Sequence, residues 1–252
     1  MINTDTLPAT KTRLVTTQKL GRVWLTLIAG PVLILLSMLA ASIYYGIVTQ
    51  GDVAAIPGLV AASTPYQLVV VLILLFFIQR WAMRRDGLTW QTIGWGKVEG
   101  QRTWRELLIG GMPGAVLGLL YVFVLAPSLA RLQASLGDYV PAGEILTTLG
   151  SSLLPFFVAN VLLAPVVEEN LYRGYALTRL FGRFSQPVAI FISCTFFGLL
   201  HWSGGLWYIL LTGLLAGGLF AGLFTARRSL LAPFAAHLAL NVVEFLYTWL
   251  VL

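Results

Sequence analysis

Seven long apolar runs decide what this chain can fold into. Each is close to the roughly 20 residues that a helix needs to cross the hydrocarbon core of a bilayer. Strands of a membrane barrel would be segments of about ten residues with alternating polarity, whereas these runs are apolar on every face. The sequence therefore predicts an all-α, polytopic transmembrane helical bundle with about seven spans, or eight if one segment is broken or re-entrant. The predicted spans are 23–48, 67–83, 107–126, 148–168 or beyond, 187–202, 206–226 and 230–252.

The scarcity of charge agrees with a membrane location. Only 10% of the residues are charged and 58% are hydrophobic, whereas soluble domains carry roughly 25% charged residues. A soluble globule and a disordered chain are both excluded, because disorder needs low hydrophobicity and high charge. The single cysteine, Cys194, lies in an apolar run, so no intrachain disulfide is expected. The net charge of +6 does not indicate a nucleic-acid partner, because the basic residues are not gathered on one solvated face.

The placement of the basic residues predicts the topology. They cluster before the first span and after the second, fourth and sixth, and these positions hold 15 of the 16 basic residues. Because Lys and Arg in short loops stay in the cytoplasm, we expect a cytoplasmic N-terminus and a C-terminus outside. The first run is too long for a signal-peptide core and is expected to be a retained anchor. The predicted cytoplasmic residues are Lys11, Arg13, Lys19, Arg22, Arg80, Arg84, Arg85, Lys97, Arg102, Arg105, Arg173, Arg179, Arg183, Arg227 and Arg228, which leaves Arg131 for the opposite side.

Three segments follow from this pattern. Residues 1–22 form a basic cytoplasmic N-terminus, 23–147 hold the first transmembrane helices, and 148–252 hold the helices that carry polar residues. Within the second segment, the loop 84–106 mixes charges with tryptophans, which is typical of a stretch in the headgroup region. Small residues every four positions predict close helix packing. They are Gly110, Gly114 and Gly118, Gly213 with Gly217, and Gly218 with Gly222.

Ionisable residues inside the late apolar runs are the main functional signal. Each costs several kcal/mol to place in a bilayer and is a functional candidate by default. The fourth predicted helix carries Glu168, Glu169 and Arg173, the fifth carries His201, and the seventh carries His237, Asn241 and Glu244. The two histidines are the only ones in the chain.

Helical geometry separates these residues into roles. Glu169 and Arg173 are spaced i, i+4 with the acid first, which favours an ion pair. Glu168 lies about 100° around the helix from Glu169, so it can face a different cavity. No basic residue on the helix is spaced to pair with it. His237 and Asn241 share one helix edge, where helix-to-helix hydrogen bonding is the structural alternative to catalysis. Glu244, one turn further, is expected to have an interfacial or supporting role.

The depth of these polar residues in the membrane tests whether they can meet. Counted from the nearest basic residues, Glu168 and His237 lie about 16 and 14 Å deep at 1.5 Å per residue. His201, counted from Pro187, lies about 21 Å deep, which leaves a mismatch of about one turn.

Three motifs in order carry a family resemblance. Residues Glu168 to Arg173 spell EExxxR, Phe197 to His201 spell FxxxH, and His237 to Asn241 spell HxxxN. This pattern resembles the CPBP family, the CAAX prenyl proteases and bacteriocin-processing (Abi) proteins, which are glutamate-dependent intramembrane proteases. The resemblance covers about residues 150–245, so 148–252 is expected to be the catalytic core.

The resemblance implies a role for each matching residue. Glu168 would be the general base that activates a water, and His201 would hold or polarise that water. His237 and Asn241 would stabilise the developing oxyanion, while Glu169 and Arg173 would support the arrangement. Asn170 and Tyr172 depart from the family pattern, which puts an apolar residue and Phe at these places. Tyr172 could add a hydrogen bond, and Asn170 leaves the substrate range open.

These inferences predict an intramembrane endopeptidase in a bacterial inner membrane. Its partners would be the lipid bilayer and a peptide or lipidated protein, of CAAX, peptide-maturation or self-immunity type. No cofactor is required for a glutamate mechanism, but a zinc ion held by Glu168, His201 and His237 is an alternative, because three protein ligands suffice. Two other functions stay open: a non-catalytic immunity or scaffold protein, and a proton-coupled transporter.

Overall fold

The computed structural model describes residues 20–96, 100, 102–137 and 153–251. Most of these residues are helical, and none of them lies in a strand. Six helices in the described part are long and apolar enough to cross a membrane, and a seventh apolar helix, Gln186–Leu200, is shorter. The predicted polytopic helical bundle is therefore confirmed, and the chain is an integral membrane protein. Lys11, Arg13, Lys19, Lys97 and the start of the fourth predicted span lie outside the described residues.

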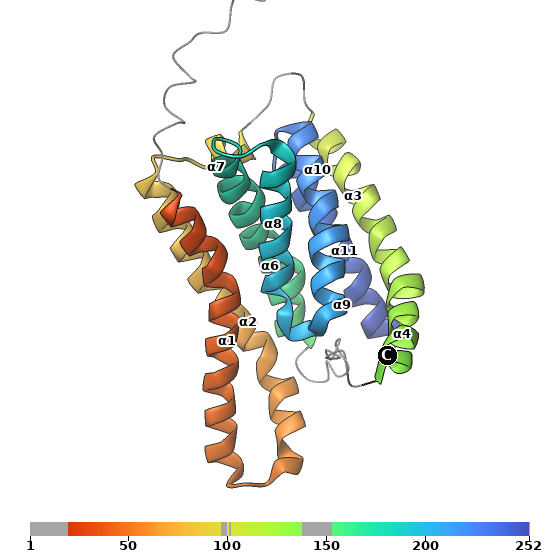
Figure 1. Cartoon of the computed structure of the whole chain (residues 1–252). Helices are drawn as coiled ribbons and strands as arrows, with labels where there is room; N and C mark the ends of the chain where they lie inside the picture. The colour runs from red at the N-terminus through yellow and green to blue at the C-terminus, as the bar shows by residue number, and fades with distance from the viewer. Residues whose placement is uncertain (1–19, 97–99, 101, 138–152, 252) are drawn as a thin grey trace, which may run out of the picture.

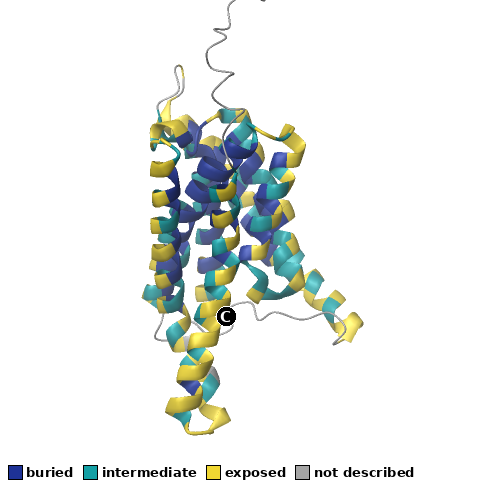
Figure 2. Ribbon diagram, turned by 60° about the vertical axis from the view of Figure 1, so that its left-hand side comes forward, coloured by how far each residue is buried: buried dark blue, intermediate teal, exposed yellow. Residues whose placement is uncertain are grey.

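The first two helices form a hairpin at one side of the bundle (Figure 1). Helix α1 covers Gly21–Thr49 and α2 covers Ile56–Arg85, joined by the short 3₁₀ turn η1, Val53–Ala55. Helix α2 begins eleven residues before the predicted span. Its first turns mix Leu59 and Val60 with Pro, Gly, Ser and Thr, so the apolar pattern did not mark them as part of the span. The far half of the hairpin extends beyond the other helices, and its surface there is mostly exposed (Figure 2).

The other helices pack into a compact group beside the hairpin (Figure 1). Several are continuous through wider π-helical turns, which interrupt the α-helical pattern without ending the helix. After η2, Gln91–Trp95, the third helix consists of α3, Thr103–Leu120, η3, Tyr121–Leu125, and α4, Ala126–Leu136. The fourth consists of α5, Leu153–Phe156, η6, Phe157–Leu163, α6, Ala164–Glu169, η7, Asn170–Leu177, and α7, Thr178–Leu180. Then follow α8, Gln186–Leu200, η8, Trp202–Gly204, α9, Gly205–Leu210, η9, Leu211–Ala216, α10, Gly217–Arg227, and α11, Leu231–Val251.

The predicted glycine stripe explains how α3 packs along α11. A Cβ atom at Gly110 would overlap the backbone carbonyl of Ala232, and one at Gly114 would overlap that of Ala236. Only glycine lets the two backbones approach this closely. The later glycine pairs differ, because Gly213 lies against α8 whereas a Cβ atom at Gly218 would have open space around it.

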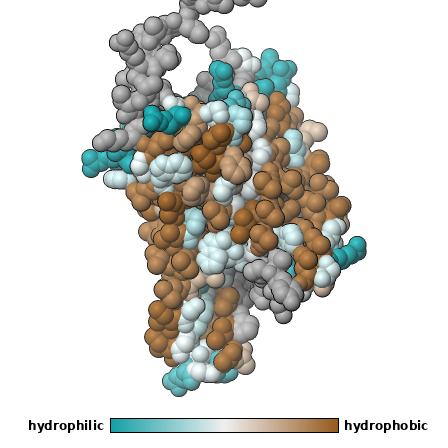
Figure 3. All heavy atoms as spheres, in the orientation of Figure 1, coloured by the Kyte–Doolittle hydropathy of each residue, from teal (hydrophilic) through white to brown (hydrophobic). Residues whose placement is uncertain are grey.

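One end of the bundle carries most of the described basic residues. The start of α1, the ends of α2, α7 and α10, and the start of α3 all lie at this end, which we call the basic end (Figure 1). Hydrophilic residues gather at the ends and apolar residues cover the flanks between them (Figure 3). Arg131, in α4, lies toward the opposite end. This arrangement agrees with the alternation seen in the sequence, and the side of the membrane stays a prediction.

Buried ion pairs tie the helices together at the basic end. Asp86, which follows α2, pairs with Arg22 of α1 and Arg179 of α7. Its carboxylate also accepts a hydrogen bond of 2.9 Å from the Tyr175 hydroxyl. Glu106 of α3 is bound through both oxygens by Arg227 of α10. These carboxylates have their charge balanced inside the protein.

Candidate active site

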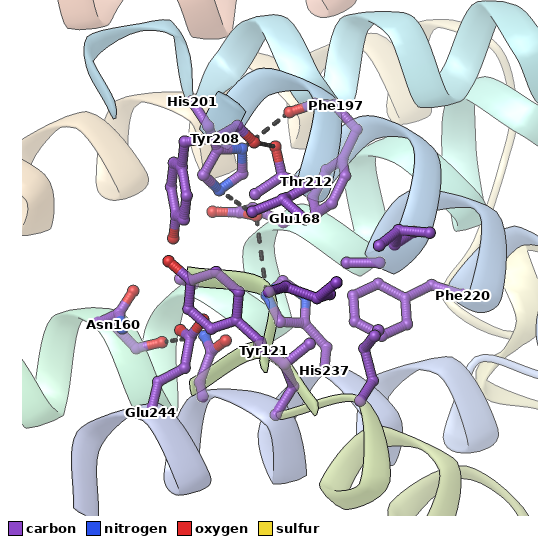
Figure 4. A pocket seen from close by; sticks show the side chains of 18 residues that line it. Tyr121, Asn160, Glu168, Phe197, His201, Tyr208, Thr212, Phe220, His237 and Glu244 are labelled. Atoms are coloured by element: carbon purple, nitrogen blue, oxygen red, sulfur yellow. Dashed lines mark hydrogen bonds and ion pairs between the residues drawn. The ribbon is translucent and has the colours of Figure 1, made fainter. Parts of the chain in front are cut away.

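Three helices bring the predicted residues together. Glu168 lies in α6, His201 directly follows α8, and His237 lies in α11. The Nε2 atoms of both histidines lie 4.0 Å from the same atom, Oε2 of Glu168. Figure 4 shows the three side chains converging on one cavity. Residues far apart in the sequence therefore form one polar centre.

The imidazole of His201 resolves the mismatch in depth. Side chains on a helix point back toward its N-terminus. The Nδ1 atom of His201 lies 2.8 Å from the carbonyl oxygen of Phe197, one turn earlier in α8. The ring therefore points back toward the start of α8, and its Nε2 atom comes within 4.0 Å of Glu168.

Hydrogen bonds at the Nδ1 atoms fix which nitrogen of each histidine faces the cavity. A carbonyl oxygen only accepts hydrogen bonds, so His201 donates through Nδ1 to Phe197. The Nδ1 atom of His237 likewise lies 2.9 Å from Oε1 of the Glu169 carboxylate. In the neutral imidazoles, both Nε2 atoms therefore present a lone pair toward Glu168.

Glu169 and Arg173 support this arrangement from behind. Oε1 of Glu169 accepts a hydrogen bond of 2.8 Å from the Arg173 guanidinium as well as the bond from His237. Arg173 also donates to the carbonyl of Gly217, and its guanidinium lies 4.1 Å from the centre of the Phe197 ring. The expected ion pair is present, and Arg173 is fully buried instead of lying in a loop with the other basic residues.

Asn241 lies on the same edge of α11 as His237, as the spacing predicts. Its Nδ2 atom donates a hydrogen bond of 2.7 Å to the carbonyl oxygen of Asn160, which lies in the π-helical stretch η6. One N–H of the amide is thus engaged by the backbone. Within the described residues this side chain makes no further hydrogen bond, and Asn241 lines the cavity.

The cavity itself has a volume of about 50 Å³, which is enough for a few water molecules. Half of the residues that line it are apolar, and the other half carry polar groups. These are Tyr121, Asn160, Glu168, His201, Tyr208, Thr212, His237, Asn241 and Glu244. Among the described residues, Oε2 of Glu168 has no hydrogen-bond partner. A buried carboxylate oxygen in a polar cavity of this size is a suitable position for water.

The structure adds residues that the sequence did not single out. Tyr121 of η3 and Tyr208 of α9 line the cavity, and the Tyr121 hydroxyl is buried without a hydrogen-bond partner in the described part of the chain. The available signal was a tyrosine in the middle of an apolar span. Glu244 also lines the cavity with only 7% of its surface exposed, so it lies inside the bundle and not at an outer interface.

A comparison with family models identifies the region that contains all three motifs. Residues 150–243 match the family described as type II CAAX prenyl endopeptidase Rce1-like. This stretch of the chain is similar to that Rce1-like family. The resemblance seen in the motifs is thereby confirmed. Searches of curated proteins and of solved structures gave no match.

Two residues depart from the family motif, and the structure explains one of them. Asn170 accepts a hydrogen bond from the indole of Trp95 in η2, and it does not line the cavity. It therefore holds η2 against η7. Tyr172 is fully buried, and its hydroxyl has no partner among the described residues. The hydrogen bond expected of Tyr172 is not present there.

The donor types of the Rce1-like site suit zinc, but their spacing does not. Two ligands of one tetrahedral zinc ion lie about 3.4 Å apart, whereas each histidine nitrogen lies 4.0 Å from the Glu168 oxygen. Within the described residues, no group of three His, Cys, Asp or Glu side chains is arranged to hold a metal. Glu168, His201 and His237 thus do not fit a zinc ion as they stand.

Proposed function

We propose that this protein is a CAAX-type intramembrane protease in which Glu168 activates the attacking water. One observation carries the proposal: an oxygen of a buried carboxylate, without a partner in the described part of the chain, faces two histidine nitrogens at 4.0 Å. A water about 2.8 Å from both atoms would bridge such a separation. The Rce1-like match supports a protease.

The arrangement suggests how peptide hydrolysis would proceed. Glu168 takes a proton from the water as the water oxygen bonds to the carbonyl carbon of the substrate. His201 accepts a hydrogen bond from the same water at Nε2 and holds it in line. When the C–N bond breaks, the proton on Glu168 passes to the leaving nitrogen. Every step uses groups that face one cavity.

The oxyanion would be stabilised from α11. Asn241 can donate the N–H that Asn160 does not engage. His237 donates through Nε2 only when it carries a second proton, and its bond to Glu169 would stabilise that imidazolium. Donors fixed in a site without bulk water contribute strongly to transition-state stabilisation. Glu169 and Arg173 would act as positioning residues for His237.

The proposed substrate is a membrane-associated peptide or a lipidated protein tail. The test is Glu168→Gln in purified, detergent-solubilised protein, because this change keeps the shape of the side chain and removes the base. We expect cleavage of lipidated model peptides to be lost while the melting temperature stays unchanged. Full activity in this variant would refute the proposal and favour an immunity or scaffold role.

A further inference from the structure

Glu244 differs from the other buried carboxylates of the described residues. Asp86 and Glu106 pair with arginines, Glu169 pairs with Arg173, and Glu168 faces two histidines. Glu244 has no basic side chain within 4.0 Å and no hydrogen bond to its carboxyl group in the part of the chain that is described. A buried carboxyl group without a partner is costly to ionise, and a cationic ligand would stabilise its charged form.

The surroundings of Glu244 form a second polar centre in the cavity. Figure 4 shows Glu244 with Tyr121 on the side of the cavity away from Glu168 and His201, with Tyr208 above them. The buried Tyr121 hydroxyl has no partner in the described residues. The carboxylate and the phenol oxygens can accept hydrogen bonds from a cationic group, and Asn160 lies beside them.

The distance from the first centre is set by α11. His237 and Glu244 are seven residues apart and lie on the same face, which corresponds to about 10 Å along the helix. An extended peptide advances about 3.3–3.6 Å per residue. The second centre therefore lies about three residues from the bond that Glu168 would attack.

We propose that Glu244, with Tyr121 and Tyr208, forms a specificity subsite for a basic side chain of the substrate about three residues from the cleaved bond. This inference rests on the proposed protease function and names its substrate class. The substrate would supply the cation that the protein lacks, as a buried acidic pocket does in a protease that selects basic residues. The subsite thus selects substrates that carry a lysine or arginine about three residues from the cleaved bond.

The test is a positional scan with lipidated apolar peptides. Each peptide carries one lysine at a different position, and a control set carries uncharged norleucine there. Mass spectrometry locates the cut in each peptide. We expect the cut to move with the lysine and to stay about three residues from it, with kcat/KM at least about 30-fold above that of the norleucine peptide.

The variant Glu244→Gln should abolish this preference, so that lysine and norleucine peptides give the same ratio of kcat/KM values, close to one. Tyr121→Phe tests the hydroxyl and should reduce the preference in part. If the position of the cut does not depend on the lysine, or if the preference for lysine persists in Glu244→Gln, the proposed subsite is refuted.

Binding separates this inference from the proposed function. Fluorescence anisotropy gives the Kd of labelled lysine and norleucine peptides for Glu168→Gln and for Glu168→Gln with Glu244→Gln. We expect the lysine peptide to bind more tightly only when Glu244 is present. If the wild-type protein cleaves no peptide, the proposed function fails, and this measurement still decides the subsite.

Discussion

Carboxyl groups are buried both at the basic end and around the cavity, but their partners differ. At the basic end, arginines bind Asp86 and Glu106 at hydrogen-bonding distances. In the cavity, Glu168 faces histidines at 4.0 Å, and Glu244 has no basic partner among the described residues. A neutralised carboxylate holds helices together, whereas an open one can take a proton or a ligand. Carboxylates that hold helices together and carboxylates that we propose take part in chemistry thus differ in their partners and not in their burial.

The adjacent glutamates Glu168 and Glu169 give the largest expected contrast. Glu168→Gln should lower kcat by about 10²- to 10⁴-fold, as expected when a general base is removed, and leave stability unchanged. Glu169→Gln leaves the buried charge of Arg173 without its partner, so unfolding should become easier by about 3–5 kcal/mol. Cleavage assays and denaturation in detergent measure the two effects. Equal losses of stability in both variants would contradict different roles for the two glutamates.

Helix packing gives the next effect. Gly114→Ala places a Cβ atom against the backbone of α11, where a backbone atom cannot move aside. We expect a loss of about 1–3 kcal/mol in stability, as for other overpacked sites. Gly218→Ala is the matched control, because its Cβ atom would have open space. Thermal melting of the two variants should differ, and identical melting would show that α3 and α11 are not tightly packed.

A smaller effect should distinguish paired from open carboxylates directly. Glu106→Gln weakens the bidentate contact with Arg227, whose side chain is 33% exposed, so we expect a loss of about 1 kcal/mol. Glu244→Gln removes a carboxyl group that has no partner in the described residues and should leave stability equal or higher. Denaturation curves under the same detergent conditions test this. A larger loss for Glu244→Gln would show that its carboxyl group is structural.

Chelation should have the smallest effect. The 4.0 Å separations around Glu168 exceed those of a zinc site, and we propose that catalysis does not need a metal. Activity should therefore persist after removal of zinc from active protein, with metal content measured before and after. If chelation abolishes activity and added zinc restores it, a metal site and not Glu168 activates the water.

Much of the fold could be predicted from the sequence because apolar runs report directly on bilayer-crossing helices. The i, i+4 spacing also predicted the pair Glu169 and Arg173, since both lie on one helix. Contacts between residues of different helices were harder to predict. The single-helix depth count placed Glu244 near an interface, because it could not show that the cavity continues between α11 and the tyrosines of η3 and α9. It also misplaced His201, since it counts Cα positions and ignores the direction of the side chain.

The length of the α1–α2 hairpin has a consequence for the surrounding membrane. Helix α1 has 29 residues and α11 has 21, which correspond to about 44 and 32 Å. The hydrocarbon core of a typical bilayer is about 30 Å thick. No single thickness matches both parts, so the hairpin must tilt, project or thicken the lipid beside it. A change in bilayer thickness should therefore change the angle between the hairpin and the bundle that holds the cavity.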